Sequence, residues 1–188
     1  DLGSLRHTLI RRLSRHSLVL SKLLSLHALV LLSATVLILG SWALSALLFE
    51  LGPVIEDGYE LISEEEIRQE IRLGLLLALL PLPAAIAFGL MLSVLAQSAT
   101  QALALALGIT LAFDVFKTSL GDWAAYFYAR FQPSLIDGSY LGDVARLARG
   151  YSDVLLDERL LQLNYWAPWP ALLAFLALCL LFVRRKPL

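Results

Sequence analysis

The stretch "LLSLHALVLLSATVLILGSWALSALLF", residues 23–49, contains no aspartate, glutamate, lysine or arginine. About 20 consecutive apolar residues are enough for a helix to cross the hydrocarbon core of a bilayer. Residues 23–49 are therefore long enough to form a membrane span, and the rest of the chain has to be interpreted around that span. The alternative is a soluble all-α protein in which several helices are completely buried.

Three further apolar runs decide between these alternatives. Residues 74–113 carry no formal charge and are divided by the polar sequence "QSATQ" at 97–101, and a last run extends over 166–183. These runs predict spans at 73–96, 102–120 and 166–183. Of the 188 residues, 59% are hydrophobic and 16% are charged, against roughly 45–50% and about 25% in soluble domains. We therefore expect an all-α, polytopic helical membrane protein with four spans.

The lysines and arginines predict which side of the membrane each segment faces. They gather at the two ends of the chain, as Arg6, Arg11, Arg12, Arg15 and Lys22 before the first span and Arg184, Arg185 and Lys186 after the last. Cytoplasmic loops are enriched in these residues. We therefore expect cytoplasmic ends at 1–22 and 184–188 and external segments at 50–72, which is strongly acidic, and 121–165. This places the chain in the cell membrane, such as a bacterial inner membrane.

Two other interpretations of the basic N-terminal segment are disfavoured. The net charge of −1 gives no bulk attraction to nucleic acid. A secretory signal peptide has a shorter apolar core, followed by a cleavage site and a soluble domain. One observation does not support the predicted topology, because the turn at 97–101 is expected on the cytoplasmic side and carries no positive charge.

Local patterns predict the segments between the spans. Ser63 and Glu66 have the spacing of a capping box, which predicts a short helix over 61–72 ahead of the second span. Pro81 and Pro83 should kink or partly break that span near its start. Within 121–164 the apolar positions predict short helices that rest at the membrane interface.

The sequence offers little for catalysis or metal binding. It has no P-loop, no G-x-S-x-G and no H-E-x-x-H, its three histidines have no carboxylate cluster nearby, and its one cysteine lies in an apolar run. We therefore expect no catalytic residue, metal or cofactor. The polar exception is Asp114 in the third span, with Lys117 three residues later on the same helical face. This pair is interpreted either as structural or as a contact for a transported substrate.

The basic segment resembles a known family. "GSLRHTLIRRLSRHSLVLSKLL", residues 3–24, is similar to a segment of the permeases of the ABC transporter type-2 class, and the matching positions include Gly3, Leu5, Leu9, Ser14, Arg15, Lys22 and Leu23. "FGLMLSVLAQSATQALALALG", residues 88–108, is similar to the fourth and fifth spans of the same class. The sequence departs from the family at Arg12, where proline is usual, at Ser21, where glycine is usual, and at Gln97, where a basic residue is common. Within the class, the chain resembles the permeases of copper-site maturation and gliding-type systems.

The resemblance implies a function and partners. Such permeases have six spans, so these would be the last four, and two spans would precede them in a longer protein. Residues 3–15 would form a cytoplasmic coupling helix that docks onto a separate ABC ATPase subunit through Gly3, Leu5, Arg6, Leu9, Arg11, Arg12, Ser14 and Arg15. Two permease copies would form the pathway, for export. The alternatives are a membrane scaffold or assembly protein that transports nothing, or an intramembrane enzyme.

Overall fold

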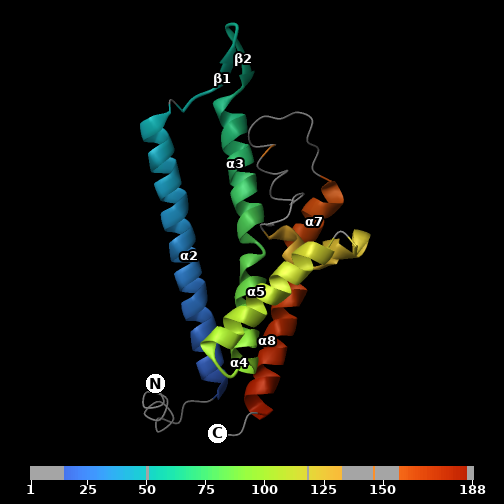
Figure 1. The fold of residues 1–188 in the computed structure, drawn as a ribbon. Coiled ribbons are helices and arrows are strands. Elements are labelled where there is room, and N and C mark those ends of the chain that lie inside the picture. Colours follow the sequence, from blue (N-terminus) through green and yellow to red (C-terminus); the bar gives the residue numbers. More distant parts are fainter. Residues whose placement is uncertain (1–14, 50, 118, 133–145, 147–156, 186–188) are drawn as a thin grey trace.

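The computed structural model describes residues 15–49, 51–117, 119–132, 146 and 157–185, and these fold mostly into helices (Figure 1). In chain order the elements are α2 (Arg15–Leu48), β1 (Val54–Glu56), β2 (Tyr59–Ile62), α3 (Glu64–Leu79), α4 (Leu82–Leu95), α5 (Ala99–Phe116), the short 3-10 helices η1 (Gly121–Tyr126) and η2 (Tyr128–Phe131), α7 (Glu158–Trp166) and α8 (Pro168–Arg185). Within the described residues, four helical stretches are long and apolar enough to cross a membrane: His16–Leu48, Glu64–Leu95, Ala99–Phe116 and Glu158–Arg184. The predicted all-α polytopic fold is confirmed.

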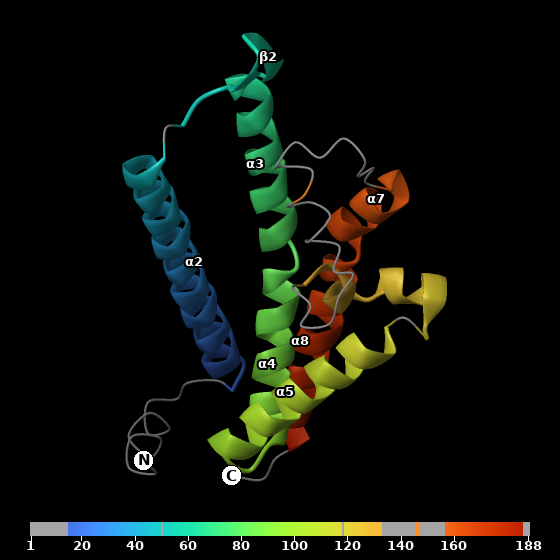
Figure 2. The ribbon, with the colours of Figure 1, turned by 45° about the horizontal axis from the view of Figure 1, so that its top comes forward.

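The helices pack around α4. Helices α3 and α4 stack end to end into one column, α8 lies alongside α4, and α5 crosses the lower part of the column (Figures 1 and 2). Helix α2 meets α4 near its own first turns and diverges from the column towards the hairpin (Figure 1). The described part of the chain is therefore a bundle around α4 with one helix standing largely apart.

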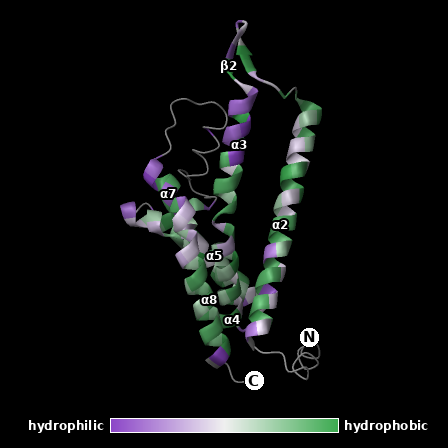
Figure 3. Ribbon diagram, turned by 180° about the vertical axis from the view of Figure 1, so that it is seen from behind, coloured by the Kyte–Doolittle hydropathy of each residue, from purple (hydrophilic) through white to green (hydrophobic). Residues whose placement is uncertain are grey.

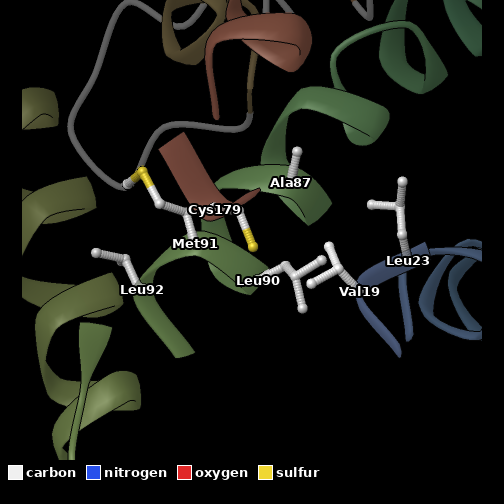
Figure 4. Close-up of a cluster of buried hydrophobic side chains, with 7 residues drawn as sticks. All are labelled: Val19, Leu23, Ala87, Leu90, Met91, Leu92 and Cys179. Carbon is white, nitrogen blue, oxygen red and sulfur yellow. The ribbon is translucent and has the colours of Figure 1, made fainter. Parts of the chain in front are cut away.

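The core lies where α2, α4 and α8 meet (Figure 4). Its buried residues are Val19 and Leu23 of α2, Ala87, Leu90, Met91 and Leu92 of α4, and Cys179 of α8. Of the described α2 residues, only Val19 and Leu23 are buried. The small side chains of Ala84 and Ala87 are fully buried, and small residues let membrane helices pack closely.

Helix α3 begins at the predicted capping box. The Ser63 hydroxyl accepts a hydrogen bond from the Glu66 backbone N–H at 3.2 Å, and the Glu66 carboxylate accepts one from the Ser63 backbone N–H at 2.9 Å. The sequence predicted that this helix would end near residue 72, but α3 continues to Leu79. The apolar residues after position 72 contain no helix-stopping signal before Leu80 and Pro81. The break therefore falls inside the column, and the expected short helix at 61–72 and span at 73–96 become α3 and α4.

A β-hairpin joins α2 to α3, and the sequence analysis did not predict it. Strands β1 and β2 pair antiparallel, and their turn is Asp57-Gly58 with φ values of 50° and 81°. Two consecutive residues at positive φ match the right-handed twist of a hairpin, and Asp-Gly is a sequence that adopts them readily. The dipeptide was thus an available signal for this hairpin.

The other boundaries also differ from the expected ones. Helix α2 begins at Arg15 instead of residue 23, so Lys22 lies within it. Helix α5 begins after the Ser98 cap and ends at Phe116, before residue 120, and the short helices η1 and η2 follow from Gly121. The interfacial helices expected within 121–164 lie largely outside the described residues, apart from α7.

Hydrophilic residues gather at the hairpin and the first turns of α3, and at the start of α2 and the end of α8, and a further group lies on α7 between these two ends (Figure 3). A hydrophobic zone separates the hairpin and the first turns of α3 from the start of α2 and the end of α8. Those last two ends lie together, because Arg184 Nη2 is 3.4 Å from His16 Nε2. This distribution is the one that a bilayer imposes on a spanning protein.

Candidate functional site

A groove separates α2 from α4 near the core. It has a volume of about 570 Å³ and is lined by Ser21, Lys22, Ser25, Leu26 and Val30 of α2 and by Ile86, Gly89, Leu90 and Ser93 of α4. Most of this lining is apolar, but both walls carry serine hydroxyls and α2 adds an ammonium group. Ligand sites of this size commonly combine apolar walls with a few polar groups.

A second groove continues between α2 and α3. It has a volume of about 670 Å³ and is mainly apolar, with lining residues that include Leu37, Trp42, Ile67, Ile71 and Leu75. Glu64 and Arg68, which form an ion pair in the first turns of α3, also line it. The two grooves together extend along the side of α2 that faces the column. Among the described residues of α2, only Val19 and Leu23 are buried.

The structure brings Asp114 and Lys117 together at the end of α5. Lys117 Nζ lies 2.6 Å from Asp114 Oδ1, and the lysine side chain is only 5% exposed. A buried ammonium group needs such a partner, because desolvation without one costs several kcal/mol. The pair does not line either groove beside α2, so a direct contact with substrate stays a prediction.

A buried asparagine stabilises the break between α3 and α4. In an unbroken helix the N–H of residue 81 would bond to the carbonyl of Leu77, but proline has no N–H. Asn164 of α7 replaces it, because its Nδ2 donates to the Leu77 carbonyl at 3.1 Å. Asn164 is fully buried, and its Oδ1 has no hydrogen-bond partner among the described residues. The α7 end of the last helical stretch is thereby attached to the middle of the column.

Three aromatic rings connect α4, η2 and α8 just beyond the core. The ring centroid of Phe175 lies 5.3 Å from that of Phe88 and 5.5 Å from that of Tyr128. Burial raises the pKa of the Tyr128 hydroxyl above its usual range. The cluster fixes η2 against both helices.

The residues expected to contact an ATPase can be placed only in part. Gly3, Leu5, Arg6, Leu9, Arg11, Arg12 and Ser14 lie outside the described residues, and Arg15 is the first residue of α2.

His27 uses its Nδ1 to contact the Leu23 carbonyl of its own helix at 2.8 Å. Among the described residues, no group of three or more His, Cys, Asp or Glu side chains could hold a metal ion.

Sequence reasoning missed the serines of the α2–α4 groove and the role of Asn164. Pro81 shows that a carbonyl at Leu77 loses its partner, but nothing in the sequence names a donor 87 positions away. The groove depends on how α2 and α4 are placed, and neither Ser25 nor Ser93 belongs to a recognisable motif. The Asp114–Lys117 contact is local and was accessible from the spacing alone.

The four long apolar helices and the polar ends define the chain as a polytopic integral membrane protein. Residues 1–183 match the family described as ABC-2 family transporter protein. The match covers nearly the whole chain, so the chain belongs to this family of ABC transporter permeases. No curated protein and no solved structure matches it. The match is to the family as a whole and does not distinguish a branch within it.

Proposed function

We propose that this chain is the permease subunit of an ABC transporter, that it moves substrate along the grooves beside α2, and that a separate ATPase subunit drives it. The main support is the separation of α2 from the α3–α4 column within a chain of this family. A permease needs a helix that can change its position relative to its neighbours. Helix α2 has few buried contacts, so such a change disrupts little of the core.

Two copies of the chain are proposed to form the pathway. Large apolar side chains of α2 are exposed along its length, and Leu37 is 70% exposed. These side chains can face lipid or a neighbouring helix, and closed symmetric assemblies are the usual form of membrane and soluble oligomers. The family resemblance implies a paired permease. It therefore supports the interpretation that part of this surface faces a helix of the second copy. Export is the direction that the same resemblance implies.

Coupling to the ATPase is proposed to occur through residues 3–15. These residues directly precede α2, and α2 contacts α4 and α8 near its own start. A partner that binds residues 3–15 would therefore act on α2 close to the point where it is held. The proposal places both ends of the chain on the cytoplasmic side of the cell membrane. The basic residues gather at these ends, and cytoplasmic segments of membrane proteins are enriched in lysine and arginine.

The proposal is tested by purifying the full-length chain together with a co-expressed ABC ATPase subunit from the same source. The double variant Arg11→Gln and Arg12→Gln should lose most of the co-purifying ATPase, while Arg6, Arg15 and Lys22 preserve the basic character of the segment. The matched control is Arg68→Gln, which removes one arginine at the opposite end of the bundle and should leave ATPase recovery unchanged.

Accessibility labelling of single cysteines at positions 12 and 185 should find both on the cytoplasmic side. Labelling on opposite sides would overturn the proposed topology. Unchanged ATPase recovery in the double variant would overturn the proposed docking segment. Assembly with a different partner, without an ATPase, would favour the scaffold function.

A further inference from the structure

A polar pocket lies at the end of α5, away from both grooves beside α2. It has a volume of about 330 Å³ and is lined by Lys117, Gly121, Asp122, Ala124, Ala125, Arg130, Asp157, Arg159 and Leu160. The lining comes from the end of α5, from η1 and η2, and from the start of α7. Gly121 has a φ of 53°, and a Cβ added there would meet no atom within 4 Å, so the pocket is open on that side.

Charges of both signs converge on this pocket. Lys117, Arg130 and Arg159 are contributed by α5, η2 and α7, and Asp122 and Asp157 by η1 and the cap of α7. Lys117 is buried and held by Asp114, which fixes its ammonium group in place. The bonds of a planar guanidinium and an ammonium group to phosphate oxygens are strong and charge-assisted.

Arg159 is positioned by an aromatic residue. Its Nη2 donates to the Tyr126 hydroxyl at 3.2 Å, and its guanidinium carbon lies 5.9 Å from the centre of the Tyr126 ring. Asp122 and Asp157 interact with it electrostatically, but within the described part of the chain neither carboxylate forms an ion pair. One oxygen of Asp157 accepts the Arg159 backbone N–H at 2.9 Å, which leaves its other oxygen available.

Two of the elements that line the pocket, η1 and α7, also carry exposed tryptophans. Trp123 is 73% exposed and Trp166 is 72% exposed, and exposed tryptophans of membrane proteins gather at the level of the lipid headgroups. Val115 and Phe116, which directly precede Lys117, are exposed and apolar. A ligand held by the charged lining can thus extend an apolar portion along α5.

We propose that this pocket binds the headgroup of a phospholipid in which a phosphodiester carries a primary amine. The lysine and arginines match the phosphodiester, and the carboxylates of Asp122 and Asp157 accept hydrogen bonds from the ammonium group. Free inorganic phosphate fits less well, because it would place its negative charge beside both carboxylates. The inference is independent of the transport role, since it uses no residue of the grooves or of the coupling segment.

The test is native mass spectrometry of the full-length protein released from nanodiscs that contain equal parts of phosphatidylethanolamine, phosphatidylglycerol and phosphatidylcholine. Wild-type protein should retain phosphatidylethanolamine above the other two lipids. Arg159→Gln should reduce its retention about tenfold, the loss expected for one charge-assisted hydrogen bond, and Arg159→Lys should reduce it less. Asp122→Asn should shift the preference towards phosphatidylglycerol, because it removes the carboxylate that meets the amine.

The matched control is Arg72→Gln, which removes an exposed arginine that lines neither this pocket nor the grooves beside α2 and should change no lipid preference. Helical content measured for each variant separates a binding defect from misfolding. Equal retention of the three lipids by the wild-type protein would overturn the proposal, as would unchanged retention in folded Arg159→Gln. Binding of soluble phosphoethanolamine or inorganic phosphate as tightly as the lipid would refute the interfacial headgroup.

Discussion

Helices α2 and α4 are both apolar enough to cross a membrane, yet their surroundings differ. In the stretch formed by α3 and α4, 39% of the most apolar window is buried within the chain, whereas in α2 the figure is 0%. Helix α4 contacts α2, α5 and α8, and its small residues Ala84 and Ala87 are fully buried. Helix α2 has leucines on most of its sides and two buried residues near its start.

The difference shows that the apolar composition of a helix indicates an apolar environment, but does not indicate whether lipid or other helices provide it. A leucine exposed to lipid and a leucine inside the bundle contribute equally to the hydropathy of a helix. Both environments suit the side chain, because lipid tails are as apolar as leucine. What distinguishes α4 is packing, through alanines and well-filled contacts. Substitutions that change volume but keep apolarity should therefore separate the two helices.

The largest effect is expected from removing a packed leucine. Leu92→Ala in α4, where the side chain is 4% exposed, should lower the free energy of unfolding by about 2–5 kcal/mol, because a cavity replaces a filled site. Leu32→Ala in α2, where the side chain is exposed, is the matched control and should change it little. Unfolding in mixed micelles followed by circular dichroism measures both. Equal losses would show that α2 is packed as tightly as α4.

Overpacking provides the second comparison. Ala87→Leu in α4 should cost about 1–3 kcal/mol, because its fully buried alanine leaves no room for three more carbon atoms. The same substitution at the exposed Ala43 of α2 should be close to neutral. The same unfolding experiment applies. A neutral Ala87→Leu would mean that α8 can move away from α4 without loss.

The helix break gives a third effect, of intermediate size. Asn164→Leu removes the donor to the Leu77 carbonyl and should cost about 1–2 kcal/mol. Pro81→Ala returns a backbone N–H to that carbonyl, so the double variant should be less destabilised than the sum of the single ones. A double-mutant cycle of unfolding free energies measures this coupling. Strict additivity would show that Asn164 stabilises something other than the break.

The smallest effect is expected on the exposed part of α2. Ser33 donates from its hydroxyl to the Leu29 carbonyl of its own helix at 2.9 Å, so it needs no partner from another helix. Ser33→Ala should change the free energy of unfolding by less than about 0.5 kcal/mol, and it should leave the recovery of a second permease copy unchanged in cross-linking. A loss of dimer would place Ser33 in an interface between copies.

Features that depend on neighbouring residues were predictable from the sequence. The Ser63–Glu66 cap and the Asp114–Lys117 contact both follow from spacing along one helix, and the four apolar runs became the long helices. The Asp57-Gly58 turn is equally local, but the strands on either side of it have only three and four residues, too few for a clear alternating pattern. Helix α2 begins at Arg15, ahead of the span expected at 23–49, because a helix can continue beyond the apolar run and include Lys22.

Features that depend on assembly were not predictable. The partner of the Leu77 carbonyl comes from Asn164 after the chain has passed through α4, α5 and the short helices. The grooves exist because α2 diverges from the column, and no residue of α2 encodes that angle by itself. The pocket at the end of α5 likewise combines Lys117 with Arg130 and Arg159 from separate elements.

The attachment of α2 at Val19 and Leu23 gives this helix the mechanics of a lever with its fulcrum at one end. From Leu23 to Leu48 the arm is about 38 Å long at about 1.5 Å per residue, so a rotation of about 10° displaces its tip by about 7 Å. The first turn of α2, from Arg15, lies on the short side of the fulcrum, where a small displacement is amplified on the long side. The hairpin follows the tip of α2. Such a rotation would therefore displace the hairpin further than any other described element that is connected to α2.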